Sequence, residues 1–139
     1  MENIQVSTRI RPFSRKELAS QEKEIWQINQ THNKIDLLPE YKRLFNKSQK
    51  SSFIFDHCLP PNFTNEDIYS KAIRDLIFDS LEGINSTIFV YGQTGSGKTH
   101  TMIGPKNETK EQAAQDAQDE KGVVGLGLRD LFDRLEMVW

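Results

Sequence analysis

The stretch TIFVYGQTGSGKTHTMIG, residues 87–104, constrains this chain more than any other part of its sequence. It contains a complete G-x-x-x-x-G-K-[S/T] phosphate-loop motif. The motif comprises Gly92, Gln93, Thr94, Gly95, Ser96, Gly97, Lys98 and Thr99. Its glycines permit positive φ angles, so that backbone N–H groups turn inward and form an anion-binding nest. We expect Lys98 to contact the β- and γ-phosphates and the Thr99 hydroxyl to bind Mg²⁺. The sequence therefore predicts a nucleotide site at residues 92–99.

The patterns on both sides of the motif are a strand before it and a helix after it. The apolar run STIFVY, residues 86–91, is typical of a strand buried on both faces. A short helix is expected over residues 98–102, and Thr64 with Asp67 forms a capping-box signal for an earlier one. Other expected elements are strands at 4–10 and 52–59, a hairpin at 25–38, and a C-terminal helix with an apolar stripe of Leu128, Leu131, Phe132 and Leu135. We predict an α/β protein.

The composition argues against several classes of protein. A formal net charge of −2 is not that of a typical nucleic-acid binder. The longest apolar run is far shorter than the about 20 residues of a transmembrane helix, and no apolar signal segment opens the sequence, so we expect no membrane association. Cys58 has no cysteine partner and is expected to be a small buried residue in a reducing, cytoplasmic setting. The histidines lack the spacing of zinc ligands.

The longer string IFVYGQTGSGKTHTM closely resembles the kinesin motor domain, in which FAYGQTGSGKT-[Y/H]-TM is a hallmark. Other stretches resemble the same family in the same order, namely STRIRPF at 7–13, FIFDHCLPPNFTNEDIY at 53–69, IRDLIFDSLEGINSTIFVYGQT at 73–94 and GVVGLGLRDLFDRL at 122–135. The resemblance covers essentially the whole chain and is weakest over 17–51. It implies a P-loop NTPase fold of the kinesin type. Residues 1–139 would be an incomplete N-terminal portion of that domain, with a mixed central sheet flanked by helices.

The same resemblance implies ATP and Mg²⁺ as cofactors and assigns the contacts of the adenine. Arg9, Arg11 and Pro12 would border the base, and His100 would stack on it. An aliphatic stem, a proline face and an imidazole ring can each cover a purine. The alternatives are that the two arginines are solvated charges at a strand end and that His100 is an ordinary residue of a helix start. The resemblance also implies microtubules as the partner and a cytoskeletal location.

The chain departs from the kinesin pattern in some respects. The family's Pro-Arg pair is Gly125-Leu126 here, and the loss of a proline is expected to loosen the start of that helix. The family's N-x-x-S-S-R-S-H and D-L-A-G-S-E stretches, which hold Mg²⁺ and orient the attacking water, do not occur, so no catalytic residue is assigned. Two functions stay open. One is ATP binding within a kinesin-type ATPase and microtubule motor. The other is a truncated, inactive nucleotide-binding or interaction fragment without either switch region.

Two further expectations concern surfaces. The polar segment at about 105–121 has no apolar stripe and is expected to be a solvated loop. The STIFVY strand would have unpaired apolar edges, because in kinesins its neighbours come from later in the domain. We therefore expect the isolated chain to be poorly soluble or partly molten.

Overall fold

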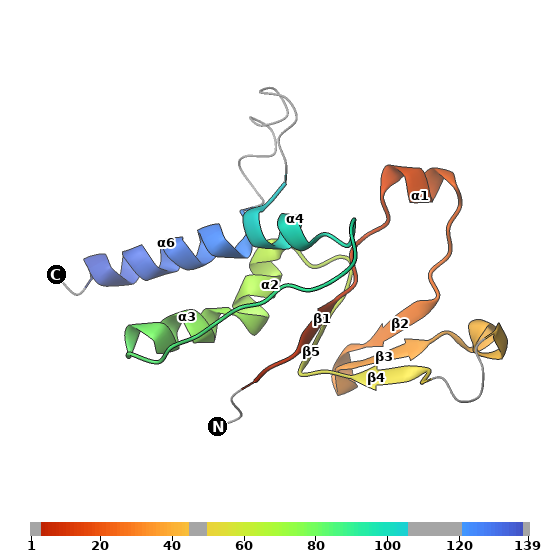
Figure 1. The fold of residues 1–139 in the computed structure, drawn as a ribbon, viewed down its shortest axis with the longest axis horizontal. Helices are drawn as coiled ribbons and strands as arrows, with labels where there is room; N and C mark the ends of the chain where they lie inside the picture. Colours follow the sequence, from red (N-terminus) through yellow and green to blue (C-terminus); the bar gives the residue numbers. More distant parts are fainter. Residues whose placement is uncertain (1–3, 45–49, 106–120, 138–139) are drawn as a thin grey trace. The chain divides into compact units, whose positions relative to one another are not determined.

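The structure is a computed structural model that describes residues 4–44, 50–105 and 121–137. The chain forms two compact units, Met1–Asn62 and Phe63–Trp139, which are described here one at a time. Short strands dominate the first unit, and helices dominate the second (Figure 1). The strands and helices together give a mixed α/β architecture with partial sheets, as the sequence predicts. The boundary at Asn62 follows Pro60 and Pro61.

In the first unit, strands β1 (Ser7–Arg9) and β5 (His57–Leu59) form a parallel pair. Thr8 is opposite Cys58, and the Ile10 N–H extends the pairing by donating to the Leu59 carbonyl at 3.0 Å. Cys58 is only 1% exposed, and this burial raises the pKa of its thiol. The prediction that Cys58 is a buried apolar residue is confirmed.

The expected hairpin at 25–38 is also confirmed. Strands β2 (Trp26–Asn29) and β3 (Lys34–Leu37) pair antiparallel around the 3₁₀ turn η1 (Gln30–His32). Asn33 takes the left-handed conformation after that turn, with φ 46°. Strand β4 (Ser52–Ile54) adds to the other edge of β3, and the 3₁₀ segment η2 (Pro39–Leu44) follows β3 in the chain. Ile35 and Leu37 on β3 are buried and supply the core of this sheet.

The single strand predicted for residues 52–59 is wrong, because this segment forms two strands in different sheets. Up to Phe55 it belongs to the antiparallel sheet, where the Phe55 N–H donates to the Asn33 carbonyl at 2.9 Å. At Asp56 it changes partner. The Asp56 N–H donates to the Val6 carbonyl at 3.0 Å, and the Asp56 carboxylate accepts from the Val6 N–H at 2.6 Å. The pairing partner, which hydrophobic periodicity does not reveal, decides where one strand ends.

In the second unit, helix α2 (Asn65–Ala72) begins where the capping-box signal predicted. Thr64 Oγ1 accepts from the Asp67 N–H at 3.1 Å, and the Asp67 carboxylate accepts from the Thr64 N–H at 2.9 Å. The helix does not continue unbroken to Gly83 as its periodicity suggests. It is interrupted at Ile73, with φ −127°, and α3 (Arg74–Leu81) follows. Neither glycine nor proline stands at this break, and nothing in the sequence marks it.

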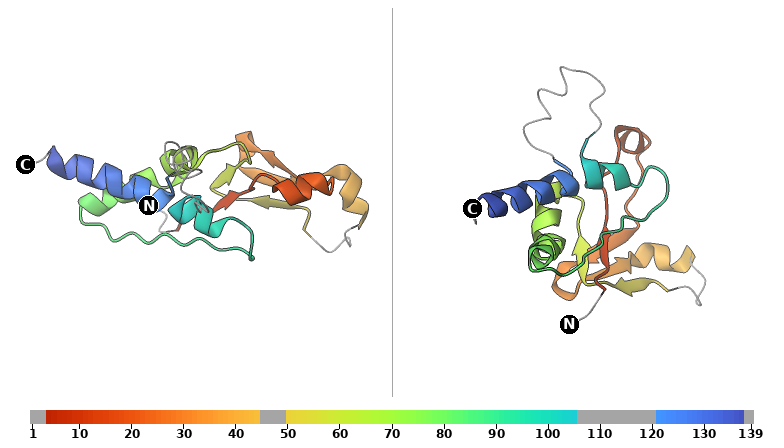
Figure 2. Two further views of the ribbon diagram at one scale, coloured as in Figure 1. Left: turned by 90° about the horizontal axis from the view of Figure 1, so that it is seen from above. Right: turned by 60° about the vertical axis from the view of Figure 1, so that its left-hand side comes forward.

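Helix α6 (Val123–Glu136) contacts α2, α3 and α4 (Lys98–Ile103), as Figures 1 and 2 show. The side chains buried where these helices meet are Ile68, Tyr69, Ile73, Val123 and Leu126. A Cβ on Gly127 would lie 3.2 Å from Ile77 Cδ1, so the absence of a side chain lets α3 and α6 approach closely. None of the described helices is long and apolar enough to cross a bilayer.

The prediction of a C-terminal helix is correct, but most of its predicted apolar stripe is exposed. Leu128, Phe132 and Leu135 are 50%, 59% and 39% exposed. The buried face instead passes through Leu126 and Gly127, whereas farther along α6 the described contacts with α2 and α3 are made by the polar side chains of Asp130 and Arg134. Gly125 does not prevent an early start, since the Leu126 N–H already donates to the Gly122 carbonyl at 3.1 Å.

The buried strand predicted for STIFVY is also wrong. Residues 84–93 are extended but form no strand, and no described strand pairs with them. Phe89 is 88% exposed and Tyr91 is fully exposed. A strand is defined by its hydrogen-bonded neighbour, so an apolar run without one stays an unpaired, exposed segment.

Candidate functional site

The phosphate-loop motif forms a tight turn directly before α4. Gly95 and Gly97 have φ angles of 82° and 92°, which side chains rarely allow. The Ser96 N–H donates to the Gln93 carbonyl at 3.1 Å and closes the turn. Gly92 has a φ of 156°, which side chains also rarely adopt, and a Cβ there would lie 2.5 Å from Ser96 Oγ, so that the Ser96 side chain would have to move. The fixed glycines of the motif therefore have local structural reasons, and the turn they form is suited to an anion.

Lys98 turns its side chain back onto this loop. Its ammonium donates to the carbonyls of Gly92 at 2.7 Å and Gln93 at 2.8 Å. An ammonium has three donors, so these two bonds leave capacity for a third acceptor. The one positive charge expected to face the phosphates is thus held at the loop by the loop's own backbone.

The first turn of α4 carries Thr99 and His100. Thr99 is exposed, so its hydroxyl is accessible to a metal ion, and His100 is half-buried. The turn is joined to the loop by Thr101, whose N–H and hydroxyl both donate to the Gly97 carbonyl, at 2.9 and 3.0 Å. The motif is thus one continuous unit from the loop into the helix, and its residues fit a phosphate with its metal ion. Stacking of His100 on a base stays a prediction.

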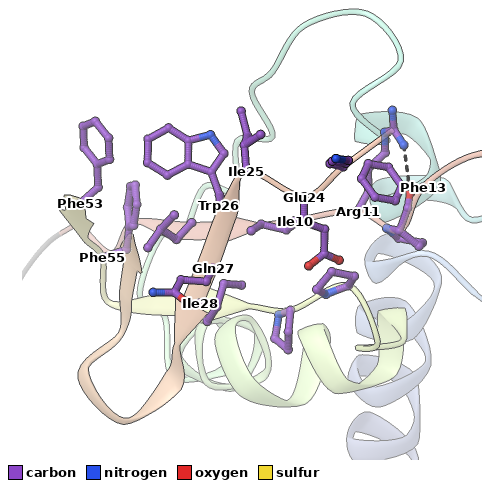
Figure 3. A pocket seen from close by; sticks show the side chains of 15 residues that line it. Ile10, Arg11, Phe13, Glu24, Ile25, Trp26, Gln27, Ile28, Phe53 and Phe55 are labelled. Carbon is purple, nitrogen blue, oxygen red and sulfur yellow. Dashed lines mark hydrogen bonds between the residues drawn. The ribbon is translucent and has the colours of Figure 1, made fainter. Parts of the chain in front are cut away.

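The remaining predicted base contacts lie in the first unit. Arg9 is on β1, opposite Leu59. The Arg11 guanidinium forms a two-pronged ion pair with Glu17, at 2.6 and 2.7 Å. It also donates to the Pro12 carbonyl at 2.8 Å, the bond dashed in Figure 3. This pairing raises the pKa of Arg11 and lowers the pKa of Glu17 to about 2. Arg11 is therefore a partnered residue that secures α1 (Arg15–Ala19), rather than the solvated charge of the simpler interpretation.

Arg11 and Pro12 also line a pocket of about 570 Å³ within the first unit. Figure 3 shows the rings of Trp26 and Phe53 beside one another at the far side of this pocket from Arg11. Their centroids are 5.9 Å apart and the rings are tilted by 56°. The volume is within the usual range for small-molecule sites, about 300–1,000 Å³. Aromatic, aliphatic and proline side chains in the walls suit a flat, apolar group. Arg9 does not line this pocket.

Comparison with known proteins now decides the family. The sequence profile of the kinesin motor domain matches residues 9–138. The chain is 34% identical over 134 residues to Kinesin-like protein KIN-5C of Arabidopsis thaliana, an alignment that covers 96% of this chain and 13% of that protein. It is 33% identical over 138 residues to Kinesin-like protein Klp61F of Drosophila melanogaster, covering 99% of this chain and 12% of that protein. This chain belongs to the kinesin motor domain family.

The kinesin chain spans only about an eighth of the length of these relatives. An alignment with Kinesin-like protein KIN-7N of Arabidopsis thaliana, 33% identical over 138 residues, covers 99% of this chain and 14% of that protein. The family match includes the phosphate loop and all the predicted base contacts. The family match supports a P-loop NTPase fold. The mixed partial sheets and helices seen here are consistent with this fold but are not specific to it.

Sequence reasoning missed several residues that hold this kinesin site in place. Asn65 at the start of α2 donates to the His100 carbonyl, and Gly122 donates to the Ile103 carbonyl at the end of α4. Glu17, which pairs with Arg11, is another such residue. The Ser14–Glu17 spacing was an available signal, since it forms a capping box. No local pattern signals the long-range contacts of Asn65 and Gly122.

Proposed function

We propose that residues 92–99 bind ATP with Mg²⁺ and that this chain is the nucleotide-binding portion of a kinesin-type microtubule motor. The observation that carries the proposal is the intact loop within a chain of the kinesin family. Its glycines are required by backbone angle or by space, and its lysine ammonium is held at the loop. In this proposal Lys98 binds the β- and γ-phosphates and Thr99 binds Mg²⁺. When bound, the metal ion would neutralise phosphate charge.

We further propose that Arg9, Arg11, Pro12 and His100 contact the adenine, as in the family. The position of Arg11 and Pro12 at an apolar pocket of suitable size supports a flat base in this region. Movement along microtubules, driven by ATP hydrolysis, is proposed for the whole motor. The same proposal places the protein on the cytoplasmic microtubule cytoskeleton. Residues 1–139 would form one part of that motor, with 105–121 as a surface loop; most of that segment lies outside the described residues.

The test is equilibrium binding of a fluorescent ATP analogue to the chain, with and without Mg²⁺. Lys98→Ala removes a charged hydrogen-bond donor and should weaken binding by about tenfold or more. Lys71→Ala is the matched control, since Lys71 is exposed on α2 and also carries one positive charge. Equal effects of the two substitutions would contradict a specific role for Lys98.

Thr99 tests the metal separately. Thr99→Ala should reduce the gain in affinity that Mg²⁺ provides, whereas Thr99→Ser keeps the hydroxyl and should preserve it. A Mg²⁺ effect that is unchanged in Thr99→Ala would argue against Thr99 as a ligand. Phosphate release that is stimulated by microtubules and lost in Lys98→Ala would favour the motor over the alternative of an inactive nucleotide-binding fragment.

A further inference from the structure

Asn65 is the only buried polar residue in the described part of the chain, and 0% of its surface is exposed. It is the first residue of α2, directly after the capping residue Thr64. Its side-chain amide donates to the His100 carbonyl at 3.0 Å, across 35 residues of sequence. The acceptor is a carbonyl oxygen, so the amide nitrogen must face it. This bond connects α2 directly to the helix that follows the phosphate loop.

Helix α4, which carries the His100 carbonyl, is too short to be stable without contacts from other elements. Lys98–Ile103 has 6 residues, which is less than two turns, and isolated helices of that length are unstable in water. The described contacts fix it from two ends. At its C-terminal end the Gly122 N–H donates to the Ile103 carbonyl at 3.2 Å. In its first half Asn65 is bonded to His100, the residue after Thr99.

The chemistry of an amide makes this contact selective for one position of the helix. Burying an amide costs free energy unless its hydrogen bonds are satisfied. The bond to the His100 carbonyl, which also accepts the Gly104 N–H at 3.0 Å, recovers part of that cost. A shift of α4 along its axis would break this bond.

We propose that Asn65 is a positioning residue for the nucleotide site. By holding the His100 carbonyl, it sets the place of the first turn of α4, and thereby of Lys98 and Thr99, relative to the rest of the helical unit. It touches neither nucleotide nor metal in this role. The inference rests on the proposed function, because Asn65 would position residues of the same nucleotide site.

The test compares two substitutions on α2 that each remove a part-buried hydrogen bond to another helix. Asn65→Leu keeps the approximate shape of the side chain and loses the bond to α4. Tyr69→Phe loses the bond from the Tyr69 hydroxyl to the Asp130 carboxylate, 3.0 Å long, which joins α2 to α6 away from the loop. Thermal unfolding of both variants measures their general loss of stability. Asn65→Asp, which keeps the shape but cannot donate when ionised, is the second variant if Asn65→Leu does not fold.

Two measurements are made on each variant. In Mg²⁺-ATP binding, Asn65→Leu should raise Kd by about threefold to tenfold, whereas Tyr69→Phe should stay within about twofold of the unsubstituted chain. In hydrogen exchange without nucleotide, the Thr101 and Gly104 amides should exchange faster in Asn65→Leu and not in Tyr69→Phe. Similar changes in both variants, or no change in Asn65→Leu, would overturn the proposal. If the unsubstituted chain binds no nucleotide, the proposed function fails, while the exchange measurement still decides whether Asn65 positions α4.

Discussion

Replacing Gly122 with alanine is expected to destabilise the helical unit strongly, by more than the ordinary cost of alanine at a helix N-cap, the position that Gly122 occupies in α6. Gly122 has φ −70°, an angle that any residue adopts, so backbone conformation is not the reason. The reason is space. A Cβ at this position would lie 2.3 Å from both the Ile103 carbonyl carbon and the Met102 carbonyl oxygen, where carbon contacts normally need about 3.5–4.0 Å. The atoms in the way are backbone, which cannot rotate aside as a side chain can.

The size of the effect follows from what must move. Separating α4 from Gly122 costs the overpacking energy, about 1–3 kcal/mol, and breaks the 3.2 Å bond from the Gly122 N–H to the Ile103 carbonyl, about 0.5–1.5 kcal/mol. We therefore expect Gly122→Ala to lower the free energy of unfolding by about 2–4 kcal/mol. It should also weaken nucleotide binding, because α4 carries Lys98 and Thr99.

Gly125 supplies the matched control in the same helix. A Cβ there would meet only the Lys121 side chain, at 3.7 Å or more, so Gly125→Ala has room. It should stabilise the protein by about 0.5–1 kcal/mol, the ordinary gain from replacing glycine in a helix. Urea denaturation of the unsubstituted chain and both variants measures the three free energies. A Gly122→Ala variant as stable as the Gly125→Ala variant would refute the close approach of α4 and Gly122.

Three further predictions concern other parts of the chain. Glu17→Gln should lower the free energy of unfolding at neutral pH. The folded pKa of Glu17 is depressed to about 2, so its stabilising contribution is present above its unfolded pKa and is lost as the pH falls from about 4.5 towards 2. The urea midpoints of the two proteins should therefore converge in acid. Replacing residues 106–120 with a short glycine-serine linker should change the free energy of unfolding by about 1 kcal/mol or less. The reason is that the described residues on either side are already joined by the hydrogen bond from the Gly122 N–H to the Ile103 carbonyl. A large loss of stability in urea denaturation would contradict this. Phe89→Ser should increase the soluble fraction after centrifugation at high protein concentration, since this ring is 88% exposed, and strong hydrogen-exchange protection of the Ile88–Tyr91 amides in a monomer would count against an unpaired segment.

Local chemistry allowed much of this protein to be predicted from its sequence. The Thr64–Asp67 capping box marks the start of α2 because both of its hydrogen bonds form within four residues. The hairpin around Asn33 and the helix after Lys98 likewise depend on neighbours in sequence. Family membership was also predictable, because the phosphate loop and its flanking residues form one continuous stretch. The roles of individual loop residues in binding stay predictions that the proposed experiments test.

Contacts between residues far apart in sequence decided the rest. STIFVY has the composition of a buried strand, yet it is unpaired because a strand depends on a neighbour that its own residues cannot specify. The sequence predicts the wrong buried face for α6, because Gly127, which lets α3 approach, carries no hydrophobic signal. The sequence alone determined the family and the phosphate loop, whose geometry is local. Only the tertiary structure shows that Asn65 and Gly122 hold the helix carrying Lys98 and Thr99, because hydrogen bonds across 35 and 19 residues depend on how the chain folds back on itself.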